Sequence, residues 1–120
     1  MLNKKDLGDF GEKIAYSYLR KESYKILERN FRSKHGEIDI IAQDKDTLVF
    51  VEVKTRLGDK FGYPQEAVNQ WKLKTIEKVG QYFRLLHPNL PEAERIDVVA
   101  ITAGLSGKVE KIELIKNASN

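Results

Sequence analysis

Residues 36–56, GEIDIIAQDKDTLVFVEVKTR, have the pattern of two β-strands joined by a short polar turn. Side chains alternate across a strand, so the second strand has two faces of different character. One face is apolar almost throughout and must be core: Val49, Val51, Val53 and Thr55. The other face begins apolar and becomes charged: Leu48, Phe50, Glu52, Lys54 and Arg56. A helix that covers only the beginning of this second face would leave its charged end facing a polar cleft.

The turn between these strands decides which side chains meet across the hairpin. A turn of two or four residues centred on Lys45-Asp46 sets residue 39 opposite residue 52 and residue 37 opposite residue 54. Directly opposed Cβ atoms lie roughly 4.5–5.5 Å apart, so Asp39 and Glu52 would be neighbouring carboxylates. Two carboxylates side by side repel unless a cation bridges them. Oxygen ligands with no sulfur and little imidazole favour Mg²⁺ or Mn²⁺ over zinc.

The acidic residues also have a structural interpretation. Glu37 and Lys54 would then form an ordinary cross-strand ion pair, worth at most about 1 kcal/mol at the surface. Asp39 would be a residue at the start of a strand whose carboxylate is satisfied by backbone donors. A turn with an odd number of residues would undo the pairing altogether. The pattern alone leaves a metal site and a structural role both open, whereas for Asp97 we expect a structural role beside a nearby arginine.

The flanking segments predict a single α/β domain. A helix is expected over Leu7–Leu19, where close packing against another element would explain Gly8 and Gly11 on the apolar face. A second helix is expected from about Glu66 to Leu86, after a loop at residues 57–64. The remaining expected strands are YKILERNFR (24–32), RIDVVAITA (95–103) and KVEKIELIK (108–116). The order is α-β-β-β-α-β-β, a mixed β-sheet flanked by helices.

Composition narrows the possible functions. The 120 residues fit one domain, and the absence of cysteine excludes disulfides, thiolate catalysis and Cys-ligated zinc. The only histidines, His35 and His87, are far apart in sequence, so a His-rich metal site is not expected. No apolar run has the length of a membrane span and the N-terminus lacks a secretory signal, so we expect a cytoplasmic protein without a membrane partner. The net charge of +3 permits nucleic-acid binding without establishing it.

Several spaced motifs resemble those of known families. Asp39, followed by Glu52-Val53-Lys54 on the next strand, resembles the D…E-x-K core of the PD-(D/E)XK nuclease superfamily. Glu12, on the first expected helix, resembles the early glutamate of the archaeal-type Holliday-junction resolvases in that superfamily. The blocks LGDFGEKIAYSYL, ILERNFRSKHGEIDIIAQD, TLVFVEVKTR, FGYPQEAV and RIDVVAI together resemble the bacterial YraN family over nearly the whole chain. The resemblance implies one restriction-endonuclease-like domain over residues 1–120 and, by analogy, a nuclease role.

The resemblance also implies roles for the motif residues. Asp39 and Glu52 would hold Mg²⁺ or Mn²⁺, together with the backbone carbonyl of Val53. Lys54 would orient or deprotonate the attacking water, or neutralise charge that develops on the phosphate. Glu12 would bring a third carboxylate to the metal, directly or through water. An ordinary surface acid remains the alternative for Glu12.

Five further residues are candidates for contacts with nucleic acid: Arg56, Lys72, Gln65, Arg32 and Lys34. Arg56 shares a strand face with the motif lysine, which suits a phosphate clamp. Lys72 lies on the apolar stripe of the second helix, where it is either a snorkelling lysine or a phosphate contact. Gln65, near the start of that helix, could help to position substrate. Arg32 and Lys34 belong to a basic edge at the turn of residues 33–36, which is either solvated or meets the DNA backbone.

These observations lead to a preferred hypothesis and a rival. The preferred hypothesis is a Mg²⁺-dependent endonuclease-like protein that hydrolyses DNA phosphodiester bonds in branched or processed DNA, with a site made of Glu12, Asp39, Glu52 and Lys54. The rival is a non-catalytic nucleic-acid-binding module that retains the nuclease fold. A structural interaction protein is a third interpretation, against which the intact D…E-x-K motif argues. Resolvase-like relatives act as dimers because a junction needs two cuts, so a homodimer is compatible with the preferred hypothesis.

Overall fold

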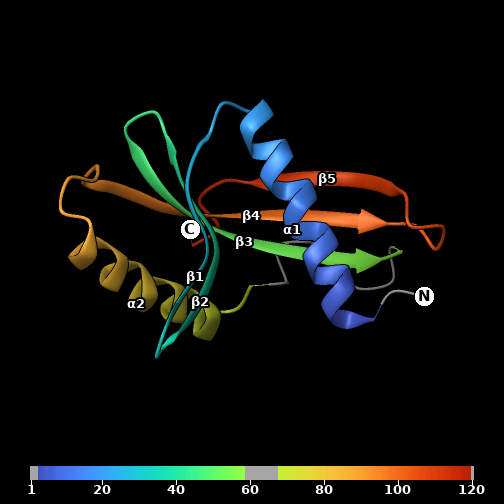
Figure 1. Ribbon diagram of the computed structural model, residues 1–120, viewed down its shortest axis with the longest axis horizontal. Coiled ribbons are helices and arrows are strands. Elements are labelled where there is room, and N and C mark those ends of the chain that lie inside the picture. Colours follow the sequence, from blue (N-terminus) through green and yellow to red (C-terminus); the bar gives the residue numbers. More distant parts are fainter. Residues whose placement is uncertain (1–2, 59–67, 120) are drawn as a thin grey trace.

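The computed structural model describes residues 3–58 and 68–119, which form a mixed β-sheet with one helix against each face (Figure 1). The elements are α1 (Lys4–Lys21), β1 (Lys25–Ser33), β2 (Gly36–Asp44), β3 (Thr47–Leu57), α2 (Gln70–Leu86), β4 (Ala93–Ala103) and β5 (Val109–Ile115). The predicted α/β class and the order α-β-β-β-α-β-β are therefore confirmed.

Both helices begin at asparagine caps. The side chains of Asn3 and Asn69 each accept a hydrogen bond from the backbone N–H three residues later, at 2.8 and 2.9 Å. Such caps satisfy donors that the first turn of a helix leaves free. α1 is longer at both ends than the predicted Leu7–Leu19, and α2 begins at Gln70, later than predicted, because Asn69 has extended backbone. No helix of the described residues is long and apolar enough to cross a membrane.

The five strands lie in the order β1-β2-β3-β4-β5, and only β3 and β4 run parallel. Parallel neighbours need a crossover connection, and α2 lies between these two strands in the sequence. β2 pairs with β3 over only part of its length and then continues with β1 as a two-stranded ribbon. Figure 1 shows this ribbon running across the direction of β3 and β4 and passing beside α2. β2 and β3 separate where their pairing ends, and the sheet is open at that place.

The core has two halves, one on each face of the sheet. α1 packs on the first face, with this buried set: Ala15, Leu19, Ile40, Val49, Val51, Val99 and Ile101. α2 packs on the second face, with this buried set: Leu48, Phe50, Leu73, Ile76, Val79, Phe83 and Ile96. On the face of β3 that was expected to be core, Val49 and Val51 are buried, Val53 is partly buried against them, and Thr55 is half-buried. On the opposite face α2 covers Leu48 and Phe50, which precede the charged end, as predicted.

Two glycines determine how closely the helices approach β3. A Cβ at Gly11 of α1 would lie 1.7 Å from Oγ1 of Thr55, and a Cβ at Gly80 of α2 would lie 2.5 Å from ring atoms of Phe50. The predicted packing role is therefore confirmed for Gly11. It is wrong for Gly8, because nothing lies within 4 Å of the place where its Cβ would be. The close contact at Gly11 brings the following residue, the candidate Glu12, next to β3.

A buried polar cluster, made of Arg95, Asp97, Asp44 and Tyr24, ties β4 to the end of β2 and the start of β1. Asp97 is fully buried and accepts hydrogen bonds from Arg95 Nε (2.9 Å), the Tyr24 hydroxyl (2.8 Å) and the backbone N–H of Asn117 (3.0 Å). Arg95 also pairs with Asp44 at 2.6 Å, and this hydrogen bond lowers the pKa of Asp44. The predicted structural pairing of Asp97 with an arginine is confirmed. We call this group the Arg95–Asp97 cluster.

Candidate functional site

The β2–β3 hairpin stops pairing just before it reaches Asp39 and Glu52. The ladder ends at the pair of Ile40 and Val51, in the register that a two-residue turn predicts. Asp39 and Glu52 occupy the next position, one residue beyond this last pair. From here β2 continues beside β1, while β3 continues beside β4. The predicted register is confirmed, and the two carboxylates lie where the strands separate.

Asp39 is anchored at this separation by a backbone donor. Its Oδ2 accepts a hydrogen bond from the backbone N–H of Val53 at 2.8 Å. The Asp39 side chain thus bonds to β3 beyond the last backbone pair of the two strands. Burial raises the pKa of Asp39 to about 9, helped by a hydrogen bond with Glu52 and by the negative charges of Glu52 and Glu12. The Val53 N–H opposes this rise without cancelling it. In the absence of a cation, this raised pKa favours the protonated form of Asp39.

Glu52 is buried, with incomplete compensation for its charge. The residue is 6% exposed, and its Oε2 lies 3.2 Å from Nζ of Lys72. This ion pair lacks hydrogen-bond geometry, and Oε2 accepts no hydrogen bond from the described residues. A buried carboxylate oxygen without a donor is unfavourable. The oxygen can therefore take a further ligand. Lys72 lies at the same site, whereas the sequence could place it only on the apolar stripe of the second helix.

Asn30 of β1 links two more acids to this region, and sequence reasoning missed it. Its Nδ2 donates hydrogen bonds to Oε1 of Glu12 (2.6 Å) and to Oε1 of Glu37 (3.0 Å). The backbone of Asn30 has a φ of 51°, a left-handed conformation that asparagine tolerates better than most residues. An asparagine inside an otherwise strand-like segment was the only signal that could have found it. Glu12 thus lies close enough for its charge to act on Asp39, but it is held by Asn30.

The expected alternative partner for Lys54 is not observed. Glu37 pairs with Arg32 instead, with 3.6 Å between Oε2 and Nε, so the predicted Glu37–Lys54 ion pair is wrong. Lys54 is half-buried on β3 and forms no ion pair with an acidic residue of the described ranges. Its ammonium group is therefore not committed to a structural ion pair with these acids.

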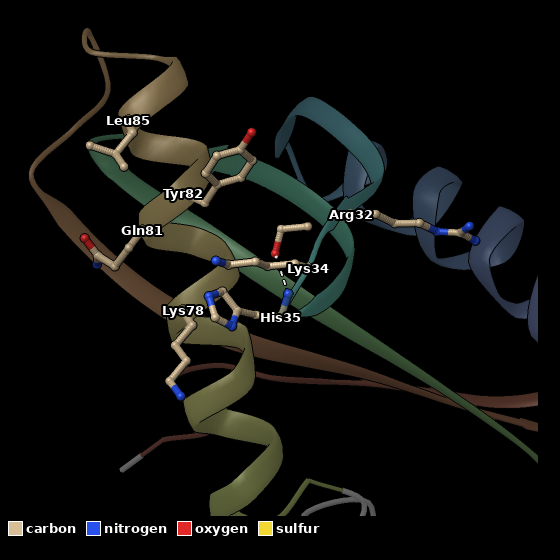
Figure 2. Close-up of a pocket in the computed structure, with 8 residues that line it drawn as sticks. Arg32, Lys34, His35, Lys78, Gln81, Tyr82 and Leu85 are labelled. Atoms are coloured by element: carbon tan, nitrogen blue, oxygen red, sulfur yellow. Dashed lines mark hydrogen bonds between the residues drawn. The ribbon is translucent and has the colours of Figure 1, made fainter.

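The other predicted binding residues are spread over the surface around the site. Arg56 lies two residues beyond the motif lysine on β3 and lines a shallow pocket with Leu7 of α1. Lys34 lies at the β1–β2 turn, where it faces α2 (Figure 2). Arg32 lies near the end of β1 and pairs with an acid of β2. Gln65 lies outside the described residues.

Comparison with known proteins identifies the family of this chain. A model described as "Uncharacterised protein family UPF0102" matches residues 11–101. The chain belongs to the UPF0102 family. A UPF0102 protein of Caldicellulosiruptor saccharolyticus is 46% identical over 98% of this chain and 99% of its own length. A UPF0102 protein of Geobacter metallireducens is 47% identical over 98% of this chain and 94% of its own length. One of Caldicellulosiruptor bescii is 48% identical over 98% of this chain and 99% of its own length. The YraN resemblance is thereby confirmed.

The carboxylate pair of this UPF0102 chain has the donor chemistry that a hard divalent cation requires. Among residues 3–58 and 68–119, no three acidic or histidine side chains are grouped closely enough to hold an ion together. Asp39 and Glu52 nevertheless provide two neighbouring carboxylates, one of which has an oxygen without a hydrogen-bond donor from the described residues. Mg²⁺ typically binds through one or two carboxylates and keeps several waters. The residues present therefore fit Mg²⁺ or Mn²⁺ without a third protein carboxylate in direct contact.

Proposed function

We propose that this UPF0102 protein is a Mg²⁺-dependent endonuclease that hydrolyses DNA phosphodiester bonds at the Asp39–Glu52 pair. The proposal is carried by one observation: the buried Glu52 and the half-buried Asp39 share the end of the β2–β3 ladder, with a raised Asp39 pKa and a Glu52 oxygen that lacks a donor among the described residues. Acids perturbed by burial and by a like charge cluster at functional sites. Positions needed only for packing would stabilise the fold better with apolar residues.

Each residue of the pair's surroundings has a role consistent with its position. Asp39 and Glu52, with the backbone carbonyl of Val53, would hold the cation, which supplies a Lewis acid for the phosphoryl oxygen and lowers the pKa of a water ligand. Lys54 directs its charge to the attacking water or to the phosphate, because no described acid neutralises it in an ion pair. Lys72 offsets the charge of Glu52, and its long stem lets the ammonium reach a phosphate of bound DNA.

Glu12 is the third carboxylate of the proposed site. Its hydrogen bond to Asn30 holds it within electrostatic range of Asp39 but outside a common metal-binding group. Rotation of the Glu12 side chain would bring it toward the pair, or it would act through a bridging water. Asn30 is then a positioning residue, since the same amide also fixes Glu37.

Basic side chains near the pair support nucleic acid as the partner. Lys54, Arg56 and Lys72 come from β3 and α2, and such charges contribute most of the affinity for a phosphate backbone. Branched or processed DNA is the substrate class that we expect, and a homodimer is expected if both strands are cut. The rival, a non-catalytic binding module, is favoured by the Lys72–Glu52 ion pair, because the lysine already supplies part of the positive charge that a cation would bring.

Cleavage of labelled linear, flapped and four-way DNA in Mg²⁺ or Mn²⁺ tests the proposal. We expect the parent protein to nick at least one substrate, and Glu52→Gln and Lys54→Ala each to slow this by at least about 10²-fold. DNA binding should persist, because phosphate contacts are distributed over several basic residues. Glu110→Gln, at an exposed position of β5, is the matched control and should keep full activity. Parent-like activity in both site variants would contradict the proposal, and a parent that binds without cleaving would favour the rival.

A further inference from the structure

A groove of about 470 Å³ lies between the β1–β2 turn and the outer side of α2 (Figure 2). The residues that form it include Lys34, His35, Lys78, Gln81, Tyr82 and Leu85. None of the described residues that line it is acidic. The size is typical of ligand sites, and the lining combines positive charge with exposed apolar surface.

Two lysines supply the positive charge of the groove. Figure 2 shows Lys34 and His35 of the turn beside α2, which carries Lys78, while Arg32 points away from them. Neither Lys34 nor Lys78 forms an ion pair with an acidic residue of the described part of the chain. The groove therefore presents cations that no described acid neutralises, which is the electrostatic complement of a chain of phosphates.

The apolar part of the groove is an aromatic ring held in a fixed orientation. Tyr82 is 43% exposed, and its ring stacks on Phe31 with 6.0 Å between centroids and 29° between planes. Phe31 is in turn packed edge-on against Phe83 at 5.0 Å. Leu85, one turn further along α2, is 81% exposed. A partly exposed ring supported from within by other aromatic rings is suited to stacking against a planar base.

The two walls of the groove are fixed relative to each other. Gly36 has a φ of 144°, and a Cβ there would lie 2.8 Å from Cγ2 of Thr75 on α2, so the turn packs directly on the helix. The backbone N–H of His35 donates to Oγ of Ser33 at 3.1 Å, which stabilises the turn itself. The groove is therefore formed before any ligand binds, so little conformational entropy is lost on binding.

A stripe along α2 runs from the groove toward the end of the helix that carries Lys72. Trp71, Lys78, Tyr82 and Leu85 recur at i, i+7, i+11 and i+14, so they share one face of the helix. Trp71 is 73% exposed, and the residue next to it, Lys72, is the one that pairs with Glu52. Lys72 and Lys78 are separated by about 9 Å along the helix axis. A few nucleotides can span this distance.

We infer that the groove binds a single-stranded segment of the DNA substrate, with phosphates at Lys34 and Lys78 and a base stacked on Tyr82; this inference rests on the proposed function. A duplex presents phosphates but no free base faces, so it would leave the aromatic wall unused. A single strand supplies both kinds of contact. A second copy of this chain fits less well, because a symmetric contact would bring like charges of the two grooves together.

Fluorescence anisotropy with a labelled oligothymidine of roughly 12 nucleotides, in metal-free buffer, tests the inference. Tyr82→Ala and Tyr82→Leu should each weaken binding roughly tenfold, because base stacking is lost, while Tyr82→Phe should bind as the parent does. Lys78→Ala should reduce the slope of log affinity against log salt by about 0.7, the value for one phosphate of a single strand. Lys108→Ala, in the remote β4–β5 turn, is the matched control and should leave the slope unchanged.

Tyr82→Leu keeps apolar bulk against Phe31, so its melting temperature shows whether a loss of binding reflects unfolding. Parent-like oligonucleotide affinity in a folded Tyr82→Leu, or an unchanged salt slope in Lys78→Ala, would overturn the inference. A change of mass in sedimentation without a change of affinity would also overturn it and identify a protein interface. Oligonucleotide binding through Tyr82 without any cleavage would contradict the proposed function alone. Cleavage with parent-like binding in Tyr82→Leu would contradict the groove alone.

Discussion

The Arg95–Asp97 cluster and the Asp39–Glu52 pair both bury acidic side chains in the same sheet. In the first, Asp97 accepts hydrogen bonds from an arginine, a tyrosine hydroxyl and a backbone N–H, and the neighbouring arginine lowers the pKa of Asp44. In the second, burial and a like charge raise the pKa of Asp39, and one oxygen of Glu52 has no donor among the described residues. Both regions contain acidic side chains in the sheet. The acids of the first have enough donors and positive charge around them, whereas the acids of the second do not.

This difference shows that burial of an acid does not by itself indicate function. The Arg95–Asp97 cluster needs nothing from solution, because Arg95 pairs with both of its carboxylates and Lys116 lies 3.8 Å from Asp44 as a second cation. Among the described residues, the carboxylate pair has the backbone N–H of Val53 and the ammonium of Lys72 as its partners, and its two acids still repel, so a cation would relieve the pair. Substitutions that act on one region and spare the other can test this contrast.

The largest effect is expected when the matched region is disrupted. Asp97→Asn should destabilise the protein by about 3 kcal/mol, because both oxygens of the buried carboxylate accept hydrogen bonds and an amide N–H₂ in place of either would face donors. Asp9→Asn, in the exposed Lys5–Asp9 pair of α1, is the control and should cost less than about 1 kcal/mol. Urea denaturation measures both. A loss in Asp97→Asn as small as that of the control would mean that the cluster is no better compensated than a surface pair.

A smaller but selective effect is expected from the cation. At a hundredfold excess over its Kd, Mg²⁺ or Mn²⁺ should stabilise the parent by about 2.7 kcal/mol and raise its melting temperature by several degrees. Asp39→Asn should be nearly unmoved because it removes one ligand. Asp97→Asn, although less stable, should keep the full response. Equal shifts in the parent and Asp39→Asn, measured by thermal melting, would place the cation elsewhere on the protein.

The hairpin that creates the carboxylate pair could be predicted because its determinants are local. Alternation of side chains fixes the faces of a strand, and a two-residue turn fixes the register, so residues 39 and 52 had to meet. The fold order followed from the same periodicities. The apolar start and charged end of the β3 face also predicted where α2 would stop covering the sheet.

The remaining parts of the site depend on docking, which spacing along the chain does not encode. Lys72 reaches Glu52 only because α2 packs on β3 at one particular position. Gly8 and Gly11 look alike on the helix stripe, and only the contact with Thr55 distinguishes them. Asn30 requires a left-handed backbone within a strand, a conformation that no periodic pattern predicts.

The smallest effect, and the one whose sign is most informative, is expected for Asp39→Asn without metal. The amide oxygen can still accept from the Val53 N–H, and the amide N–H can donate to Glu52 in place of the Asp39 proton. The variant should therefore be as stable as the parent near pH 5. Because the folded pKa of Asp39, about 9, lies above its ordinary value of 3.8, only the folded state keeps the proton between these values. The contribution of Asp39 to stability then falls as pH rises through this window.

The advantage of Asp39→Asn over the parent should accordingly grow as pH rises through this window, because the variant has no proton to lose. Asp44 behaves in the opposite way, since its lowered pKa adds stability that is lost as pH falls, but it is present in both proteins and cancels in the difference. Urea denaturation of the two proteins from about pH 5 to about pH 9, with chelator present, measures that difference. A variant that is several kcal/mol less stable at every pH, with no slope in the difference, would show that Asp39 is structural and would remove the contrast with the Arg95–Asp97 cluster.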